Sequence, residues 1–118
     1  MTALDGEHRL VQAAQALAET LERDAAQVER EGISRARLDL VAKQGLIAAS
    51  APLEFGGMAA PPAVARRITE LIAGTCATTW FVITQHRSAL DAVLATDNVE
   101  LQDRWRRKVC SGRALGAV

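Results

Sequence analysis

Apolar residues recur at helical spacing along the first third of the chain. Intervals of three and four separate Leu10, Ala14, Leu17, Leu21, Ala25 and Val28. Such spacing is typical of an apolar stripe on one side of a helix. It predicts one long first helix, which Gly32 is suited to end because helices often close with a glycine in the left-handed conformation. Ser34 is then placed to cap a second helix that runs to Gln44 and ends at Gly45.

The helical pattern is interrupted between residues 46 and 61. This stretch contains Pro52, the pair Gly56–Gly57 and Pro61. A tight turn is expected at the two glycines because glycine reaches positive φ at low cost. Pro62 suits the first turn of a helix, where a missing N–H costs nothing. A third helix is therefore predicted to start there, with an inward face made by Val64, Ile68, Leu71 and Ile72.

Two further helices complete the predicted fold. One runs from Cys76 to Leu94 and opens with CATTWFVIT, nine residues without a charge. A helix that is apolar on all sides is normally buried, so this one is expected to be the central helix, enclosed by its neighbours. Asn98 caps the last helix, which Gly112 ends and in which Leu101, Trp105 and Val109 form a stripe. The sequence thus predicts an all-α bundle of about five helices, in orthogonal or up-down order, over residues 1–112.

Composition and charge support this fold and exclude several functions. The chain has 118 residues, no Tyr, two Phe, two Trp and three Pro, and its many Ala and Leu favour helix. Its 14 basic and 14 acidic side chains cancel, which argues against nucleic-acid binding. The longest uncharged stretch, Leu71–Gln85, is shorter than the roughly 18 residues that a membrane span needs. Asp5, Glu7 and Arg9 stand where a signal peptide would be apolar, so a cytoplasmic protein is expected.

The chain contains no familiar catalytic constellation. His86, Ser88 and Asp91 lie close in sequence, but spacings of two and three on a helix point His86 and Ser88 to different sides. Cys76 and Cys110 form no CxxC pair and are expected to be reduced, half-buried thiols. The basic run 104–108 is interpreted as a solvated helix end in preference to a phosphate site. By default, Trp80 and Phe81 are core residues.

Four segments in order resemble the N-terminal helical domain of the acyl-CoA dehydrogenases. They are ERD at 22–24, LDLVAKQGLIAASAPLEFGG at 38–57, ITELIAGTCATTWFVITQH at 68–86 and NVELQDRWRRKVCSGRALGAV at 98–118. The second resembles the family's helix followed by Gly-Leu and a Pro-x-Glu-aromatic-Gly-Gly turn. The last resembles its closing helix and the Ser-Gly step into the middle domain.

The resemblance implies an enzyme with two further domains, a middle β-barrel and a C-terminal four-helix bundle. FAD lies between these two, and a glutamate of the C-terminal domain removes the acyl α-proton while the β-hydride passes to the flavin. On this reading, residues 113–118 begin a missing middle domain, and the chain alone is an inert fragment of an oxidoreductase acting on CH–CH bonds. Acyl-CoA, sister subunits of a homo-oligomer, the enzyme's own other domains and an electron-transferring flavoprotein are the implied partners.

The resemblance also implies a site. In the family the corresponding helix contributes to the far wall of the acyl pocket, which falls here on Trp80, Phe81 and Thr84, with Gln85 and His86 close by. Two large aromatic residues there favour a short or unusually shaped acyl group. Two alternatives stay open. TCATTWF also resembles flavin-dependent monooxygenases of the same fold, and Asp97 stands where the family often has Gly. The second alternative is that the chain is a stand-alone helical interaction module without catalytic chemistry.

Overall fold

The computed structural model describes residues 3–117; Met1, Thr2 and Val118, at the two ends of the predicted domains, lie outside the described residues. The elements in chain order are α1 (Ala3–Arg23), α2 (Ala25–Glu31), α3 (Arg35–Lys43), the 3-10 turn η1 (Leu53–Phe55), α4 (Pro62–Ala73), α5 (Ala77–Ala95) and α6 (Val99–Cys110). No strand occurs within residues 3–117. The predicted all-α fold is confirmed.

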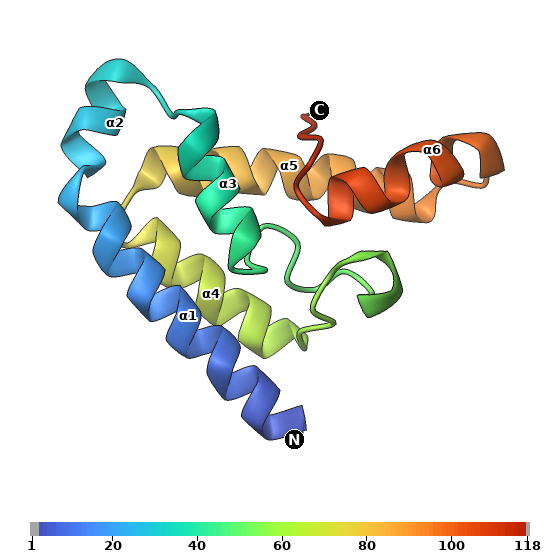
Figure 1. Ribbon diagram of the computed structural model, residues 1–118, viewed down its shortest axis with the longest axis horizontal. Coiled ribbons are helices and arrows are strands. Elements are labelled where there is room, and N and C mark those ends of the chain that lie inside the picture. Colours follow the sequence, from blue (N-terminus) through green and yellow to red (C-terminus); the bar gives the residue numbers. More distant parts are fainter. Residues whose placement is uncertain (1–2, 118) are drawn as a thin grey trace.

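The helices form a flat, open assembly. α1 packs along α4, α4 packs against the start of α5, and α6 folds back along the end of α5 (Figure 1). The principal extents are 42 × 37 × 19 Å. A molecule this thin cannot enclose a helix on every side. None of the helices within the described chain has the combined length and hydropathy that a membrane crossing requires.

Three helices begin, and one of them ends, close to the residues that the sequence predicts. The Ser34 side chain accepts a hydrogen bond of 3.1 Å from the N–H of Arg37, and Asn98 Oδ1 accepts one of 3.0 Å from the N–H of Leu101. Pro62 occupies the start of α4. Gly45 follows α3 with a φ of 76°, a conformation that a residue without Cβ adopts at little cost.

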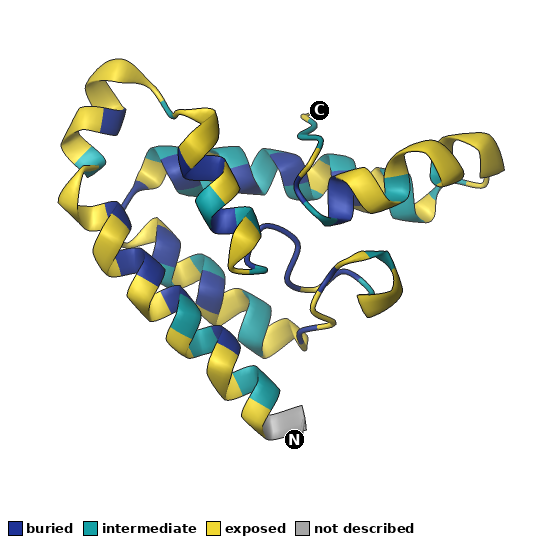
Figure 2. Cartoon of the chain, viewed as in Figure 1, coloured by how far each residue is buried: buried dark blue, intermediate teal, exposed yellow. Residues whose placement is uncertain are grey.

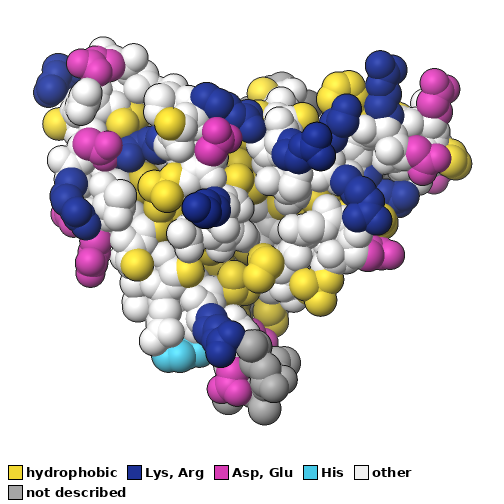
Figure 3. Space-filling view, in the orientation of Figure 1, with side chains coloured by type: hydrophobic (Ala, Val, Ile, Leu, Met, Phe, Trp, Pro, Cys, Tyr) yellow, Lys and Arg dark blue, Asp and Glu magenta, His cyan; other side chains and the backbone are white. Residues whose placement is uncertain are grey.

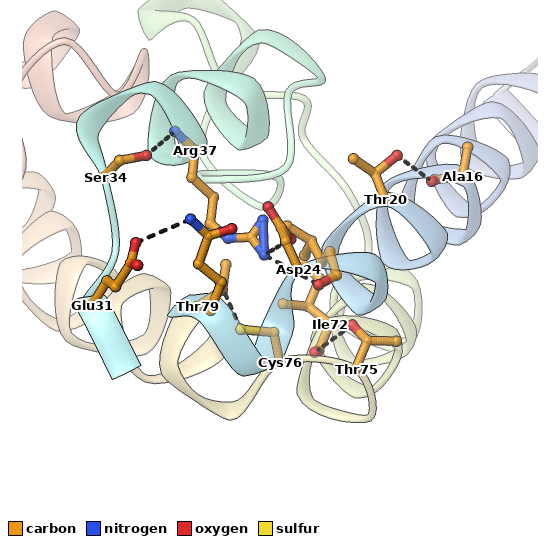
Figure 4. A network of polar contacts seen from close by, with 12 residues as sticks. Ala16, Thr20, Asp24, Glu31, Ser34, Arg37, Ile72, Thr75, Cys76 and Thr79 are labelled. Carbon is orange, nitrogen blue, oxygen red and sulfur yellow. Dashed lines mark hydrogen bonds and ion pairs between the residues drawn. The ribbon is translucent and has the colours of Figure 1, made fainter. Parts of the chain in front are cut away.

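The prediction of one continuous first helix is wrong, because the helix breaks at Asp24. Asp24 adopts φ −121° and ψ 17° between α1 and α2. The guanidinium of Arg37 donates to the Asp24 carboxylate and, at 3.1 Å, to the carbonyl oxygen of Leu21 (Figure 4). In an unbroken helix that carbonyl would accept from the N–H of residue 25. A buried arginine from α3 thus ends α1, which periodicity alone does not reveal.

The Pro-x-Glu-Phe-Gly-Gly segment forms the predicted tight turn, and its Phe55 side chain packs η1 against α6. Gly56 has a φ of 98°, and a Cβ placed on the buried Gly57 would lie 2.1 Å from the carbonyl oxygen of Ala51. The ring of Phe55 stacks under the guanidinium of Arg106, whose central carbon lies 4.0 Å from the ring centroid. Both glycines are therefore required by the backbone path.

The prediction that α5 is enclosed on all sides is also wrong. Its buried face consists of Thr79, Ile83, His86 and Leu90. The opposite side is open, and Phe81, expected in the core, is 56% exposed. In Figure 2 buried and exposed residues alternate along α5. The stripe on α6 behaves in the same way, since Val109 is buried while Leu101 and Trp105 remain 37% and 39% exposed. The flat shape explains both results, because each helix has partners on one side.

Candidate functional site

An exposed face without charge begins at the start of α5, and the exposed carboxylate of Asp91 borders it near the end of the helix. Its residues follow one another at intervals of three and four: Ala77, Phe81, Thr84, Ser88, Ala92 and Ala95. We call this set the outer face of α5. Thr84 is half-buried and the other five are exposed. Apart from Phe81, these side chains are small, so the outer face is a low surface with one projecting aromatic ring.

The structure places the three predicted site residues on two different sides of α5. Phe81 and Thr84 belong to the outer face, whereas Trp80 is half-buried and packs against the core beside α4. Trp80, Ile83 and Arg87 of α5 line a cavity of about 10 Å³ together with Leu46, Ile68, Thr69 and Ile72. That volume is about the size of one water molecule. Neither Phe81 nor Thr84 lines this cavity.

Polar contacts hold α4 and α5 together beside Trp80. Arg87 Nη2 donates a hydrogen bond of 3.0 Å to the hydroxyl of Thr69 on α4. At the start of α5, the hydroxyl of Thr79 donates to the sulfur of Cys76 at 3.0 Å. Figure 4 shows the pair of Thr79 and Cys76 close to the Arg37–Asp24 contact. Trp80 therefore belongs to a packed junction and not to an open wall.

His86 lies on the inward face of α5 and is completely buried. Its Nε2 lies 2.8 Å from the carbonyl oxygen of Val109, and its Nδ1 accepts a hydrogen bond of 3.2 Å from the N–H of Gly116. An Nδ1 that accepts requires a neutral ring with its proton on Nε2. Burial lowers the pKa of His86, the hydrogen bond to Val109 acts in the opposite direction, and the cation of Arg35 lowers it further.

The same geometry rules out a His–Ser–Asp site on α5. Ser88 lies on the outer face and its hydroxyl donates to the backbone oxygen of Thr84 at 3.5 Å. His86 points to the opposite side of the helix, toward α6. The expectation that these residues do not converge is confirmed.

The basic run on α6 stays at the surface. Arg104, Arg107 and Lys108 are exposed, and Figure 3 shows Lys and Arg side chains spread over this face of the molecule, several of them on the right-hand part, where α6 lies. Arg104 and Lys108 approach the Trp105 ring, at 5.8 and 5.2 Å from its centroid. Glu100 lines the shallow hollow beside Trp105. These contacts agree with a solvated helix end.

The two thiols are buried in the protein interior. Cys76 and Cys110 are free and buried, and burial raises the pKa of the Cys110 thiol, although Arg106 acts in the opposite direction. Burial thus keeps the Cys110 thiol protonated and unreactive. Across the described part of the chain, no three His, Cys, Asp or Glu residues group as a metal site would require.

Sequence reasoning missed the burial of Arg37 and His86. Both positions carried a signal. Arg37 precedes Val41 by four residues and so shares its inward face, and His86 stands at helical spacing from Ile83 and Leu90. Because each is polar, neither was assigned to the core. A polar residue in register with an apolar stripe indicates a buried hydrogen-bonding role.

The described residues thus form a small all-helical domain that presents the outer face of α5 to its surroundings. A family model described as acyl-CoA dehydrogenase, N-terminal domain, matches residues 5–113. The match spans most of the chain, and the chain therefore belongs to this family. None of the curated proteins compared with it matches.

Proposed function

We propose that this domain forms one wall of the acyl pocket in an FAD-dependent oxidoreductase that acts on the CH–CH bond of an acyl-CoA thioester. The observation that carries the proposal is the outer face of α5, which is uncharged and open in a domain of the acyl-CoA dehydrogenase family. Residues 113–118 would lead into the middle domain, and the isolated chain would have no activity.

The chemistry of the outer face fits an alkyl chain. Full burial of a Phe side chain is worth about 1.5–3 kcal/mol, so an exposed ring leaves part of that energy for a ligand or a neighbouring domain. The Ser88 hydroxyl donates to a backbone carbonyl and needs no partner from the substrate. Ala77, Thr84 and Ser88 leave room beside the Phe81 ring. We therefore propose that Phe81 limits the length of the acyl chain and that Thr84 contacts the chain at the base of the pocket.

Trp80 takes a supporting role in this proposal. It packs at the junction of α4 and α5, one residue before Phe81. Its substitution is expected to disturb the placement of α5 and hence to lower stability. A direct contact with substrate is proposed for Phe81 and Thr84 only.

The described residues do not themselves fit an FAD site. A hollow of about 480 Å³ beside the start of α1 is lined by Asp5, Glu7, His8, Val11 and Val64, and the negative charge of its carboxylates would repel a diphosphate. We therefore assign FAD binding and the catalytic base to the parts of the enzyme that follow this domain. The remaining partners proposed are sister subunits and an electron-transferring flavoprotein, in the cytoplasm.

The test compares Phe81→Ala with Trp80→Phe in the full-length enzyme, over saturated acyl-CoA substrates of increasing length. Phe81→Ala should shift the optimum of kcat/KM to longer chains, with about a tenfold gain for the longer over the original substrate, since one methylene in an apolar pocket is worth about 10-fold or more. Trp80→Phe should lower stability and leave the profile in place. An unchanged profile for Phe81→Ala would refute the pocket role.

The same assay addresses the competing functions. Product formed only with reduced flavin and dioxygen, on an aromatic substrate, would identify a monooxygenase and overturn the acyl-CoA proposal. The exposed Phe81 ring favours this alternative, because it can stack on an aromatic substrate. A full-length protein that binds no flavin would leave the interaction module as the explanation.

A further inference from the structure

The chain after α6 turns back onto the helices. We call residues 112–117 the C-terminal strap. Gly112 starts it with a φ of 77°, and a Cβ there would lie 2.7 Å from the Cβ of Ala42. The N–H of Ala114 donates to the carbonyl of Lys108 at 3.0 Å. A Cβ on Gly116 would lie 2.6 Å from the Cβ of Ala89. Glycines at both ends thus allow the strap to lie directly against α3 and α5 (Figure 1).

Two side chains hold the strap from opposite directions. Arg35 Nη2 of α3 donates to the carbonyl oxygens of Gly112 and Arg113, at 2.6 and 3.3 Å. His86 of α5 accepts from the N–H of Gly116 at 3.2 Å. The second contact depends on protonation, because a neutral Nδ1 accepts a hydrogen bond whereas a protonated one can only donate.

We propose that His86 is a proton-operated latch: the neutral ring holds the C-terminal strap on α5, and the protonated ring releases it. After protonation, Nδ1–H and the N–H of Gly116 face each other as two donors. The bond from Nε2 to Val109 survives, because Nε2 donates in both states. Release is therefore expected in the strap and not in the packing of α5 on α6.

The groups around His86 favour the neutral, latched state at neutral pH. Arg35 on α3 is the cation that opposes a second positive charge on the ring. On α6, Cys110 lies beside Val109, and its pKa is raised by burial, so it stays neutral. On α5, Arg87 is directed to Thr69 of α4, and in the strap Arg113 is exposed. Asp39, the carboxylate next to Arg35, is paired with it at 2.9 Å.

Two substitutions separate the two bonds of the ring. His86→Asn places an oxygen near the position of Nδ1, which can accept from Gly116 at every pH. His86→Gln places an amide nitrogen near the position of Nε2, which can donate to Val109 but leaves the Gly116 N–H without a partner. His8→Gln, on the exposed histidine of α1, is the matched control.

The experiment measures amide hydrogen exchange across the intact chain as a function of pH. The protection of each amide is its intrinsic exchange rate divided by its measured rate. In the wild type, protection of Gly116 should fall by up to tenfold per pH unit below about pH 6.5, the ordinary pKa of histidine, while the core amides of α5 remain more strongly protected than Gly116 at every pH. His86→Asn should remove this pH dependence, His86→Gln should show low protection throughout, and His8→Gln should match the wild type. Protection of Gly116 that is constant down to pH 4.5, or that equals the protection of the core amides at every pH, would overturn the latch.

Discussion

Arg37 and Asp24 form an ion pair whose two members sit in very different surroundings. The Arg37 side chain is 6% exposed, whereas that of Asp24 is 49% exposed. Arg37 also donates to the carbonyl oxygen of Leu21, and its Nε lacks a hydrogen-bond partner. This asymmetry predicts that removal of the exposed partner costs more than removal of the buried one.

The magnitudes follow from what each substitution leaves behind. Asp24→Ala leaves a buried guanidinium without its counter-charge, which costs about 3 kcal/mol, the lower end of the range for such pairs because water reaches the Asp24 side. Asp24 makes no side-chain cap bond to α2, so no capping loss is added. Arg37→Met leaves only the Leu21 carbonyl unsatisfied and removes the cost of burying a charge, for a net loss of about 1–2 kcal/mol.

Urea denaturation followed by far-UV circular dichroism at neutral pH measures these free energies of unfolding. Asp24→Ala should be the least stable variant, and the double variant should recover to the level of Arg37→Met, because no buried charge is then left uncompensated. Glu22→Ala, exposed on the same part of α1, should stay within about 0.5 kcal/mol of the wild type. The reasoning is refuted if the double variant is less stable than Asp24→Ala.

Three further predictions use the same assay. Gly57→Ala should lower the free energy of unfolding by more than about 3 kcal/mol, since its Cβ would lie 2.1 Å from a backbone carbonyl oxygen. Gly6→Ala in α1, whose Cβ would have nothing within 4 Å, should raise it by up to about 1 kcal/mol. Equal effects of the two substitutions would contradict this prediction. Because the folded pKa of His86 is lowered, the stability it contributes is complete above about pH 6.5 and is lost as the pH falls below that value, by at most about 1.4 kcal/mol per unit; a flat pH profile in this window would argue against it. Leu90→Ala, at 1% exposure, should cost about 2–5 kcal/mol, and Leu53→Ala, at 68%, less than about 0.5; similar losses would show that the burial pattern is wrong.

Features set by local chemistry could be predicted from the sequence. Ser34, Asn98 and Pro62 begin their helices as expected, and Gly45 follows α3 in the left-handed conformation. Each of these positions acts on a backbone group within a few residues, so the neighbours along the chain carry the whole signal. The same is true of the turn at Gly56.

Features set by contacts between distant parts of the chain could not be predicted from the sequence. The break at Asp24 depends on Arg37, which belongs to another helix. The openness of α5 at Phe81 depends on the number of helices that pack around it. An uncharged stretch such as CATTWFVIT shows that no side of the helix demands water, but Ala and Thr tolerate exposure, so it does not show that every side is covered. The sequence therefore places Trp80, Phe81 and Thr84 on one helix, as the structure does, but it does not show that Trp80 packs against the core while Phe81 and Thr84 lie on the other side. Their role in a substrate site stays a prediction.

If the proposed function holds, the two faces of α5 have separate roles, one in stability and one in substrate specificity. Its inward face, with Ile83, His86 and Leu90, carries the packing, and its outer face carries the proposed acyl contact at Phe81. Because Phe81 is already 56% exposed in this domain, its truncation removes little packing. Substitutions at Phe81 should therefore change acyl preference at nearly constant stability of the isolated domain, whereas the adjacent Trp80 should do the reverse. Phe81→Ala should accordingly lower the free energy of unfolding of the isolated domain by no more than about 1.3 kcal/mol, because less than half of the ring is buried. A larger loss would mean that the outer face is already part of the core.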